Sequence, residues 1–185
     1  MRYHDTMTIE LDILRIISER LGAAELPFMV TGSMALAHYA TPRMTRDIDI
    51  VVALTASTLD AFQKVLADDF YYDVEAAQSA VHSERMFNLM HFSTAMKIDL
   101  IIRKSTEYRQ VEFARRQPVK LGGVPTWIVS REDLILSKLE WARESRSELQ
   151  QRDIRQLLEG PVDGTYLDHW ATRLGVHSDL RALTP

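Results

Sequence analysis

Two aspartates separated by one residue are the side chains of this sequence best placed to do chemistry. Asp47 and Asp49 occur in the run DIDIVVA (47–53), whose other residues are apolar. In an extended strand, side chains two residues apart project to the same side, about 6.6 Å apart along the chain. Both carboxylates would then face one space, while Ile48 and Ile50 enter a core. Two ionised carboxylates this close raise each other's pKa, and a divalent cation resolves that conflict.

A third carboxylate, Asp99, lies in the run IDLII (98–102), where its neighbours are all apolar. Burying an unpaired carboxylate is so costly that it becomes protonated, forms an ion pair or binds a metal. If the Asp99 strand lies beside the Asp47 strand, three carboxylates converge, and such an oxygen-rich set suits Mg²⁺. The alternative is that Asp47 and Asp49 lie on a solvated strand face.

A Gly-Ser pair supplies the complementary feature. Gly32 and Ser33 follow a short apolar strand and open a helix that is expected to end near Tyr39. Free backbone N–H groups at a helix start attract anions, Gly32 allows close approach, and the Ser33 hydroxyl can add a hydrogen bond. Phosphate is the natural ligand of such a turn. Alternatively, the pair is an ordinary helix cap.

The spacing of apolar residues predicts a mixed sheet with flanking helices. Strands are expected at 27–31, 47–53, 86–92, 96–103, 118–121 and 124–129. Helices are expected at 8–22, 32–39, 57–68, 74–81, 106–116, 131–143, 148–158 and 166–174, followed by a short terminal turn. We expect one compact unit, with a catalytic core over 1–129 and a helical lobe over 130–185 packed on it.

Composition limits the possible classes of protein. With 185 residues, 46% of them hydrophobic, the chain can bury one substantial core. Its net charge of −4 argues against broad affinity for nucleic acid, although a local basic groove is possible. The absence of cysteine excludes disulfides and thiolate metal sites. Without a leader or a long apolar run, a cytoplasmic protein with no membrane partner is expected.

The Gly-Ser turn and the three aspartates together resemble the signature of the nucleotidyltransferase superfamily with the polymerase-beta-like fold. That signature is a hydrophobic residue, Gly, then Gly or Ser, a spacer, an Asp-hydrophobic-Asp/Glu-hydrophobic strand, and a later acidic residue. This chain reads Thr31-Gly32-Ser33, thirteen intervening residues, Asp47-Ile48-Asp49-Ile50, and later Lys97-Ile98-Asp99-Leu100. Thr31 replaces the usual hydrophobic residue, and the spacer is long. The resemblance implies an α+β fold, a nucleotidyltransferase-like mixed β-sheet with a C-terminal helical lobe.

Further residues are similar to the minimal bacterial group that includes AbiEii-type toxins. They are Arg43-Met44-Thr45-Arg46-Asp47, Glu132-Asp133-Leu134-Ile135 with Lys138, and Arg152-Asp153. The resemblance implies that Asp47 and Asp49 are metal ligands and that Asp99 is a third ligand or a base. It also implies a phosphate grip by Gly32 and Ser33. Lys138 would contact the triphosphate, and Asp153 would orient Lys138.

Lys138 and Asp153 each interrupt the apolar stripe of a predicted helix. Their pairing with each other, or a Lys138 that reaches out to water, is the structural alternative. Arg43 and Thr45 share strand parity with Asp47 if the strand extends that far back, and Arg43 could then hold a phosphate; otherwise both are loop residues. Trp141 is interpreted as a packing residue.

The implied reaction is Mg²⁺-dependent transfer of a nucleoside monophosphate from a nucleoside triphosphate to a hydroxyl, with release of pyrophosphate. Two Mg²⁺ ions about 3.5 to 4 Å apart would assist the displacement. The acceptor could be tRNA, with the arginines at 103, 109, 115 and 116 as a basic flank, or a small molecule such as an antibiotic, or a protein. The remaining alternative is a non-catalytic nucleotide-binding partner or antitoxin, and a cognate toxin or antitoxin partner is possible in either case.

Overall fold

The computed structural model describes residues 3–42, 47–145 and 147–184. Its centre is a seven-stranded mixed sheet with the strand order β3-β4-β5-β2-β1-β7-β6. The strands are β1 (Phe28–Val30), β2 (Asp47–Val52), β3 (Phe70–Tyr71), β4 (Met86–His91), β5 (Lys97–Ile102), β6 (Gln117–Leu121) and β7 (Val124–Ile128). The predicted α+β class with a mixed sheet is confirmed. The short edge strand β3 was not expected from the sequence.

Nine helices accompany the sheet within the described residues. They are α1 (Tyr3–Ala23), α2 (Gly32–Tyr39), α3 (Leu59–Leu66), α4 (Val74–Ser83), α5 (Glu107–Ala114), α6 (Arg131–Ser145), α7 (Glu148–Leu158), α8 (Gly164–Arg173) and α9 (His177–Leu183). Each predicted helix is present with slightly different ends, and the expected terminal turn is the helix α9. None of the helices in the described parts of the chain combines the length and apolar character of a membrane span.

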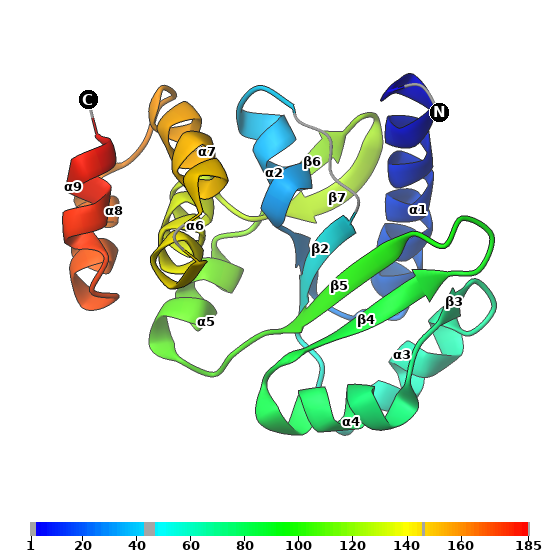
Figure 1. The fold of residues 1–185 in the computed structure, drawn as a ribbon. Helices are drawn as coiled ribbons and strands as arrows, with labels where there is room; N and C mark the ends of the chain where they lie inside the picture. Colours follow the sequence, from blue (N-terminus) through cyan, green and yellow to red (C-terminus); the bar gives the residue numbers. More distant parts are fainter. Residues whose placement is uncertain (1–2, 43–46, 146, 185) are drawn as a thin grey trace.

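Strand alternation divides the apolar side chains into two cores on opposite faces of the sheet. One core holds Ile48, Ile50 and Leu100 together with residues of α1, α3 and α4. The other holds Met29 and Ile128 together with residues of α2 and α5–α9. The helices accordingly form two groups with the strands between them (Figure 1). Asp47, Asp49 and Asp99 belong to the face that carries the second core.

The second group of helices leaves part of its sheet face open. On β4, Met86 and Met90 are 45% and 46% exposed, while Phe87 and Leu89 between them are buried in the first core. The outer half of the sheet is therefore covered on one face only, and this open area borders Asp99 across the β4–β5 pairing of Asn88 with Asp99.

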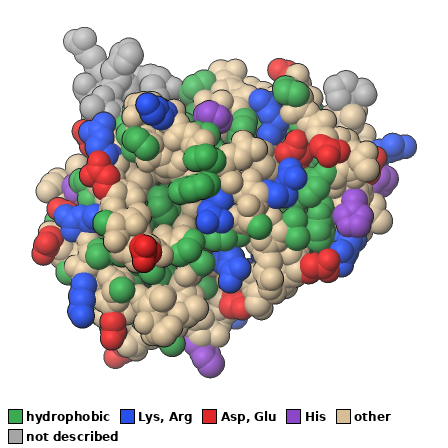
Figure 2. Space-filling model, turned by 180° about the vertical axis from the view of Figure 1, so that it is seen from behind, with side chains coloured by type: hydrophobic (Ala, Val, Ile, Leu, Met, Phe, Trp, Pro, Cys, Tyr) green, Lys and Arg blue, Asp and Glu red, His purple; other side chains and the backbone are tan. Residues whose placement is uncertain are grey.

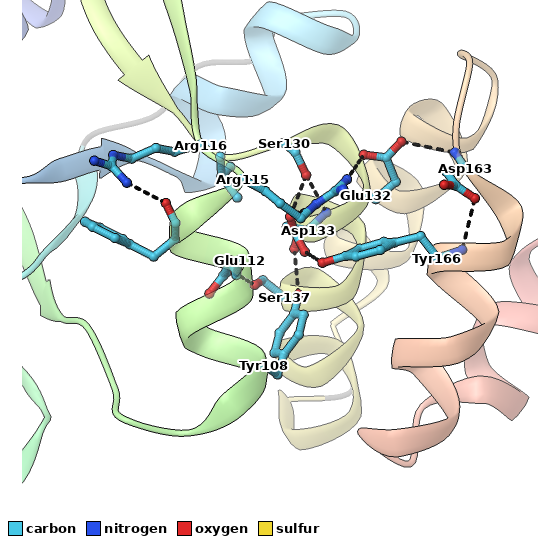
Figure 3. A network of polar contacts seen from close by, with 12 residues as sticks. Tyr108, Glu112, Arg115, Arg116, Ser130, Glu132, Asp133, Ser137, Asp163 and Tyr166 are labelled. Atoms are coloured by element: carbon cyan, nitrogen blue, oxygen red, sulfur yellow. Dashed lines mark hydrogen bonds and ion pairs between the residues drawn. The ribbon is translucent and has the colours of Figure 1, made fainter.

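A buried polar network fixes α6 against α5 and α8 (Figure 3). The Asp133 side chain is fully buried, and it accepts hydrogen bonds from Ser130 Oγ and Tyr166 Oη, both at 2.6 Å, and from Arg115 Nε at 3.1 Å. Ser130 and Asp133 also form the helix cap, because the Asp133 N–H donates to Ser130 Oγ. Every acceptor oxygen of Asp133 is thus satisfied inside the protein.

Charged side chains of both signs are interspersed on the face opposite to the view of Figure 1 (Figure 2). Hydrophobic side chains lie between them. No broad area of one sign dominates this face, in keeping with the small net charge of −4.

Candidate active site

The three predicted carboxylates line one cavity. Strand β2 pairs in parallel with β5, which places Asp49 directly opposite Asp99. Because side chains alternate along β2, Asp47 and Asp49 are partly exposed while Ile48 and Ile50 are fully buried. Asp47, Asp49 and Asp99 all line a cavity of about 280 Å³. The convergence that the sequence left conditional is therefore present.

The carboxyl group of Asp49 has a strongly raised pKa. Burial raises the pKa of its carboxyl group to about 6, with smaller contributions from the negative charges of Asp47 and Asp99. The ammonium groups of Lys138 and Lys97 act in the opposite direction but are outweighed. Ionised Asp49 therefore lacks sufficient positive charge around it, and an added cation would stabilise it.

The Gly-Ser turn lies against Asp49. Gly32 has a φ of +62°, and a Cβ atom at this position would lie 1.9 Å from Asp49 Oδ2. Only glycine fits there without displacing the carboxylate. Gly32 begins α2, and both Gly32 and the buried Ser33 line the carboxylate cavity. The anion-attracting start of a helix thus lies beside a cluster of carboxylates, an arrangement that suits a phosphate group bridged by a metal.

Lys138 and Asp153 form a buried ion pair. Lys138 Nζ lies 2.8 Å from Asp153 Oδ2 and donates to Gln150 Oε1 at 2.9 Å. The Lys138 and Asp153 side chains are 6% and 2% exposed. The pairing that was considered as the structural alternative is present, yet Lys138 and Gln150 also line the carboxylate cavity. Asp153 thus holds the ammonium group at the cavity wall, and the two interpretations are compatible.

Asp99 has a partner that the sequence did not suggest. Lys97 Nζ donates a hydrogen bond to Asp99 Oδ2 at 3.0 Å and lies 3.0 Å from Oδ1. Asp99 Oδ1 is nevertheless buried and accepts no hydrogen bond. The alternation of Lys97 and Asp99 along one strand face could have indicated this contact.

The donor set has the chemistry of a divalent-metal site but is not closed around an ion. Among the described residues, no group of three or more His, Asp or Glu side chains could hold a metal ion as it is placed. Three features nevertheless suit a hard cation: carboxylate oxygens face one cavity, Asp99 Oδ1 accepts no hydrogen bond, and Asp49 is under-compensated. Asp47, Asp49 and Asp99 are therefore the candidate ligands, and a bound ion would require these side chains to move.

A second cavity of about 340 Å³ adjoins the first. Both are lined by Thr31, Ile101, Ser137 and Trp141. Trp141 is 57% exposed, so the interpretation of this residue as packing is wrong: the indole lies at the surface and forms a wall of both cavities. Its position three residues after Lys138, a predicted site residue on the same helix, was the available sequence signal.

Two of the four arginines that were predicted to form a basic flank are engaged in ion pairs. Arg109 forms ion pairs with Glu112 and Glu140, and Arg115 forms ion pairs with Glu132 and Asp133. These arginines are committed to the fold because the buried carboxylates need compensation.

Other cations remain available beside the site. Arg85, Arg103 and Lys104 line the second cavity, and none of them forms an ion pair with a carboxylate among the described residues. The predicted phosphate contacts Arg43 and Thr45 lie outside the described residues.

Comparison with known proteins addresses the fold. No protein-family model matches the sequence, and no curated protein is significantly similar to it. The structure of the antibiotic-resistance factor ANT(2'')-Ia superposes with a TM-score of 0.61 at 13% identity, covering 95% of this chain and 92% of the other. This chain has the nucleotidyltransferase fold.

Two further proteins share this fold. An antigenic nucleotidyltransferase-like protein from Paracoccidioides brasiliensis superposes with a TM-score of 0.57 at 16% identity, and the match covers 94% of this chain and 92% of that protein. The lincosamide antibiotic adenylyltransferase LnuA, with lincomycin bound, has a TM-score of 0.52 at 14% identity, covering 83% and 94%. A complex of ANT(2'')-Ia contains adenylyl-2''-tobramycin. The narrower resemblance to AbiEii-type toxins stays a prediction.

Proposed function

We propose that this chain is a metal-dependent nucleotidyltransferase of the cytoplasm that moves a nucleoside monophosphate from a nucleoside triphosphate to a hydroxyl group. The observation that carries the proposal is the in-register pairing of Asp49 with Asp99 next to the glycine turn that opens α2. A carboxylate pair and an anion-binding turn in one cavity can hold a metal-bound triphosphate. The nucleotidyltransferase fold supports the same reaction class.

In the proposed reaction, the acceptor oxygen forms a bond to the α-phosphorus, the bond from that phosphorus to the bridging oxygen breaks, and pyrophosphate leaves. Asp47, Asp49 and Asp99 would hold Mg²⁺, which would neutralise charge on the phosphates and lower the pKa of the acceptor hydroxyl. Asp99 Oδ1, which is buried and accepts no hydrogen bond, is the atom proposed to take the acceptor's proton. Gly32, Ser33 and Lys138 would bind the phosphates that leave.

The acceptor class is proposed from the charge of the second cavity. The cavity is also lined by Glu84 and Glu112, but Arg109 pairs with Glu112, so Arg85, Arg103 and Lys104 leave an excess of positive charge. This excess favours an acceptor with negative groups, such as the end of an RNA, over an amine-rich compound like the tobramycin of the ANT(2'')-Ia complex. A small-molecule acceptor is the second candidate, because the fold is shared with two antibiotic-modifying proteins. The toxin role, with tRNA as acceptor and a cognate antitoxin, rests on the sequence resemblance.

The proposal is tested by incubating the protein with each α-³²P-labelled nucleoside triphosphate, Mg²⁺, and either total RNA or a small-molecule and protein extract. Label is expected in an acceptor, and Asp49→Asn is expected to reduce its incorporation at least about a thousandfold. Asp12→Asn is the matched control, since the Asp12 side chain is 58% exposed. Label in no fraction would favour a nucleotide-binding partner without turnover, and full activity of Asp49→Asn would refute the assigned role.

A further inference from the structure

Lys97 lies in the same two-strand array as the three carboxylates. On β5 it is two residues before Asp99, and across the parallel pairing it stands opposite Asp47 on β2. Lys97 and Asp99 therefore share one sheet face with Asp47 and Asp49. The side chains of these four residues form two adjacent rows, and Lys97 is their one positively charged member.

The two ammonium groups at the site differ in their freedom to move. Lys138 is 6% exposed and is held by Asp153 and Gln150 on neighbouring α7. The Lys97 side chain is 43% exposed, and its ion pair with Asp99 joins a solvent-accessible ammonium to a carboxylate that is only 10% exposed. Because the Lys97 ammonium is already close to water, it can be solvated when it leaves Asp99, and an arriving cation would take over the compensation of the buried carboxylate.

We infer that the Lys97 ammonium is an internal counter-ion that holds Asp99 in the metal-free protein and competes with a divalent cation for that carboxylate. The inference rests on the proposed function only in taking Asp99 as a metal ligand. Lys97 is thus a positioning residue: it holds a buried carboxylate in one orientation, and it must move when the metal site closes.

Charge repulsion favours competition between Lys97 and a divalent cation over their joint binding to Asp99. A lysine and a divalent cation on the same carboxylate repel each other, and the Lys97 nitrogen lies 3.0 Å from both oxygens of Asp99. A metal ion that approaches either oxygen therefore meets a positive charge at hydrogen-bond distance.

The test measures Mn²⁺ binding by the whole chain in the absence of nucleotide, by electron paramagnetic resonance or calorimetry. Lys97→Met is expected to bind Mn²⁺ about five to ten times more tightly than the wild type, because the competing charge is gone. Lys120→Met is the control: Lys120 is an exposed lysine on β6, and its loss should change affinity less than about twofold. Equal affinities of Lys97→Met and Lys120→Met would overturn the inference.

A double-mutant cycle distinguishes local competition from a general charge effect. In the Asp99→Asn background, Lys97→Met should bring no gain in Mn²⁺ affinity, because the contested carboxylate is absent. Lys97→Arg should keep the wild-type affinity. A gain that persists without Asp99 would show that Lys97 acts only through long-range charge, contrary to the inference.

Thermal denaturation provides a second readout and a check on folding. Lys97→Met without metal is expected to melt a few degrees below the wild type, since Asp99 loses its counter-ion, and saturating Mn²⁺ should raise its melting temperature more than that of the wild type. A gain in Mn²⁺ binding without nucleotide transfer would leave this inference standing and remove the proposed function. Absence of Mn²⁺ binding in every variant would overturn both.

Discussion

Asp133 and the pair Asp49 and Asp99 lie on the same side of the sheet, but the protein compensates their negative charges to different extents. Asp133 is surrounded by donors, with Ser130, Tyr166 and Arg115 all within hydrogen-bond distance. Asp49 and Asp99 are paired in register across β2 and β5, and the ammonium groups of Lys97 and Lys138 do not outweigh the burial and like charges that raise the pKa of Asp49. The charge of Asp133 is thus fully compensated within the protein, whereas that of Asp49 is not.

This difference in compensation distinguishes a carboxylate that stabilises the fold from one that is a candidate functional group. A buried carboxylate that is fully hydrogen-bonded fixes the elements which supply its donors, here α5, α6 and α8. A buried carboxylate that is placed against like charges carries an energetic cost, and a perturbed pKa in a cavity is typical of functional sites. In the proposed function, a bound divalent cation would remove this cost.

The largest expected change in stability comes from removing the charge of Asp133. Asp133→Asn keeps the shape of the side chain but removes the charge that compensates Arg115, so we expect it to lower the free energy of unfolding by about 3 to 5 kcal/mol. Urea denaturation measures this change. Asp12→Asn, at an exposed surface ion pair, should change stability by less than about 1 kcal/mol. A loss of similar size in both variants would contradict the structural role of Asp133.

A smaller change in stability, of opposite sign, is expected when the charge of Asp49 is removed. In the folded protein the pKa of Asp49 is raised to about 6 from 3.8, so the folded state binds a proton more tightly than the unfolded state. Ionisation above that pH therefore destabilises the fold. In metal-free buffer at pH 8, Asp49→Asn should raise the free energy of unfolding by about 1 to 3 kcal/mol.

The same linkage predicts the pH dependence of that gain. It should shrink as the pH falls through 6 and vanish only well below the unfolded-state pKa of 3.8, where the Asp49 carboxyl is protonated in both the folded and the unfolded protein. Urea denaturation at several pH values in the presence of a chelator measures it. A variant less stable than the wild type at pH 8 would show that Asp49 is well compensated after all.

The smallest effect concerns the glycine that faces Asp49. Gly32 and Gly123 both have positive φ, but only at Gly32 would a Cβ meet the Asp49 carboxylate, and nothing lies within 4 Å of a Cβ at Gly123. Both alanine variants should lose about 1 kcal/mol from backbone strain, and Gly32→Ala about 1 kcal/mol more. Urea denaturation compares them. Equal losses would mean that the carboxylate moves aside freely.

The sequence alone determined the local features of the site. Strand alternation predicted that Asp47 and Asp49 share a face, and the turn chemistry of Gly32 predicted a close approach of the backbone. Apolar periodicity also located most helices and strands, because burial on one face imposes a period on the chain. Only the two-residue strand β3 was too short to leave such a period, and α9 was underestimated as a turn.

Only the tertiary structure decided which distant groups meet. The register of β2 against β5 brings Asp99 opposite Asp49, and packing of α5 on α6 commits Arg109 and Arg115 to buried carboxylates while Arg103 stays without an ion-pair partner among the described residues. Local sequence cannot encode these choices, since strand pairing and ion pairing join residues far apart in the chain. The chain thus specifies its charged side chains locally, and the fold assigns their partners.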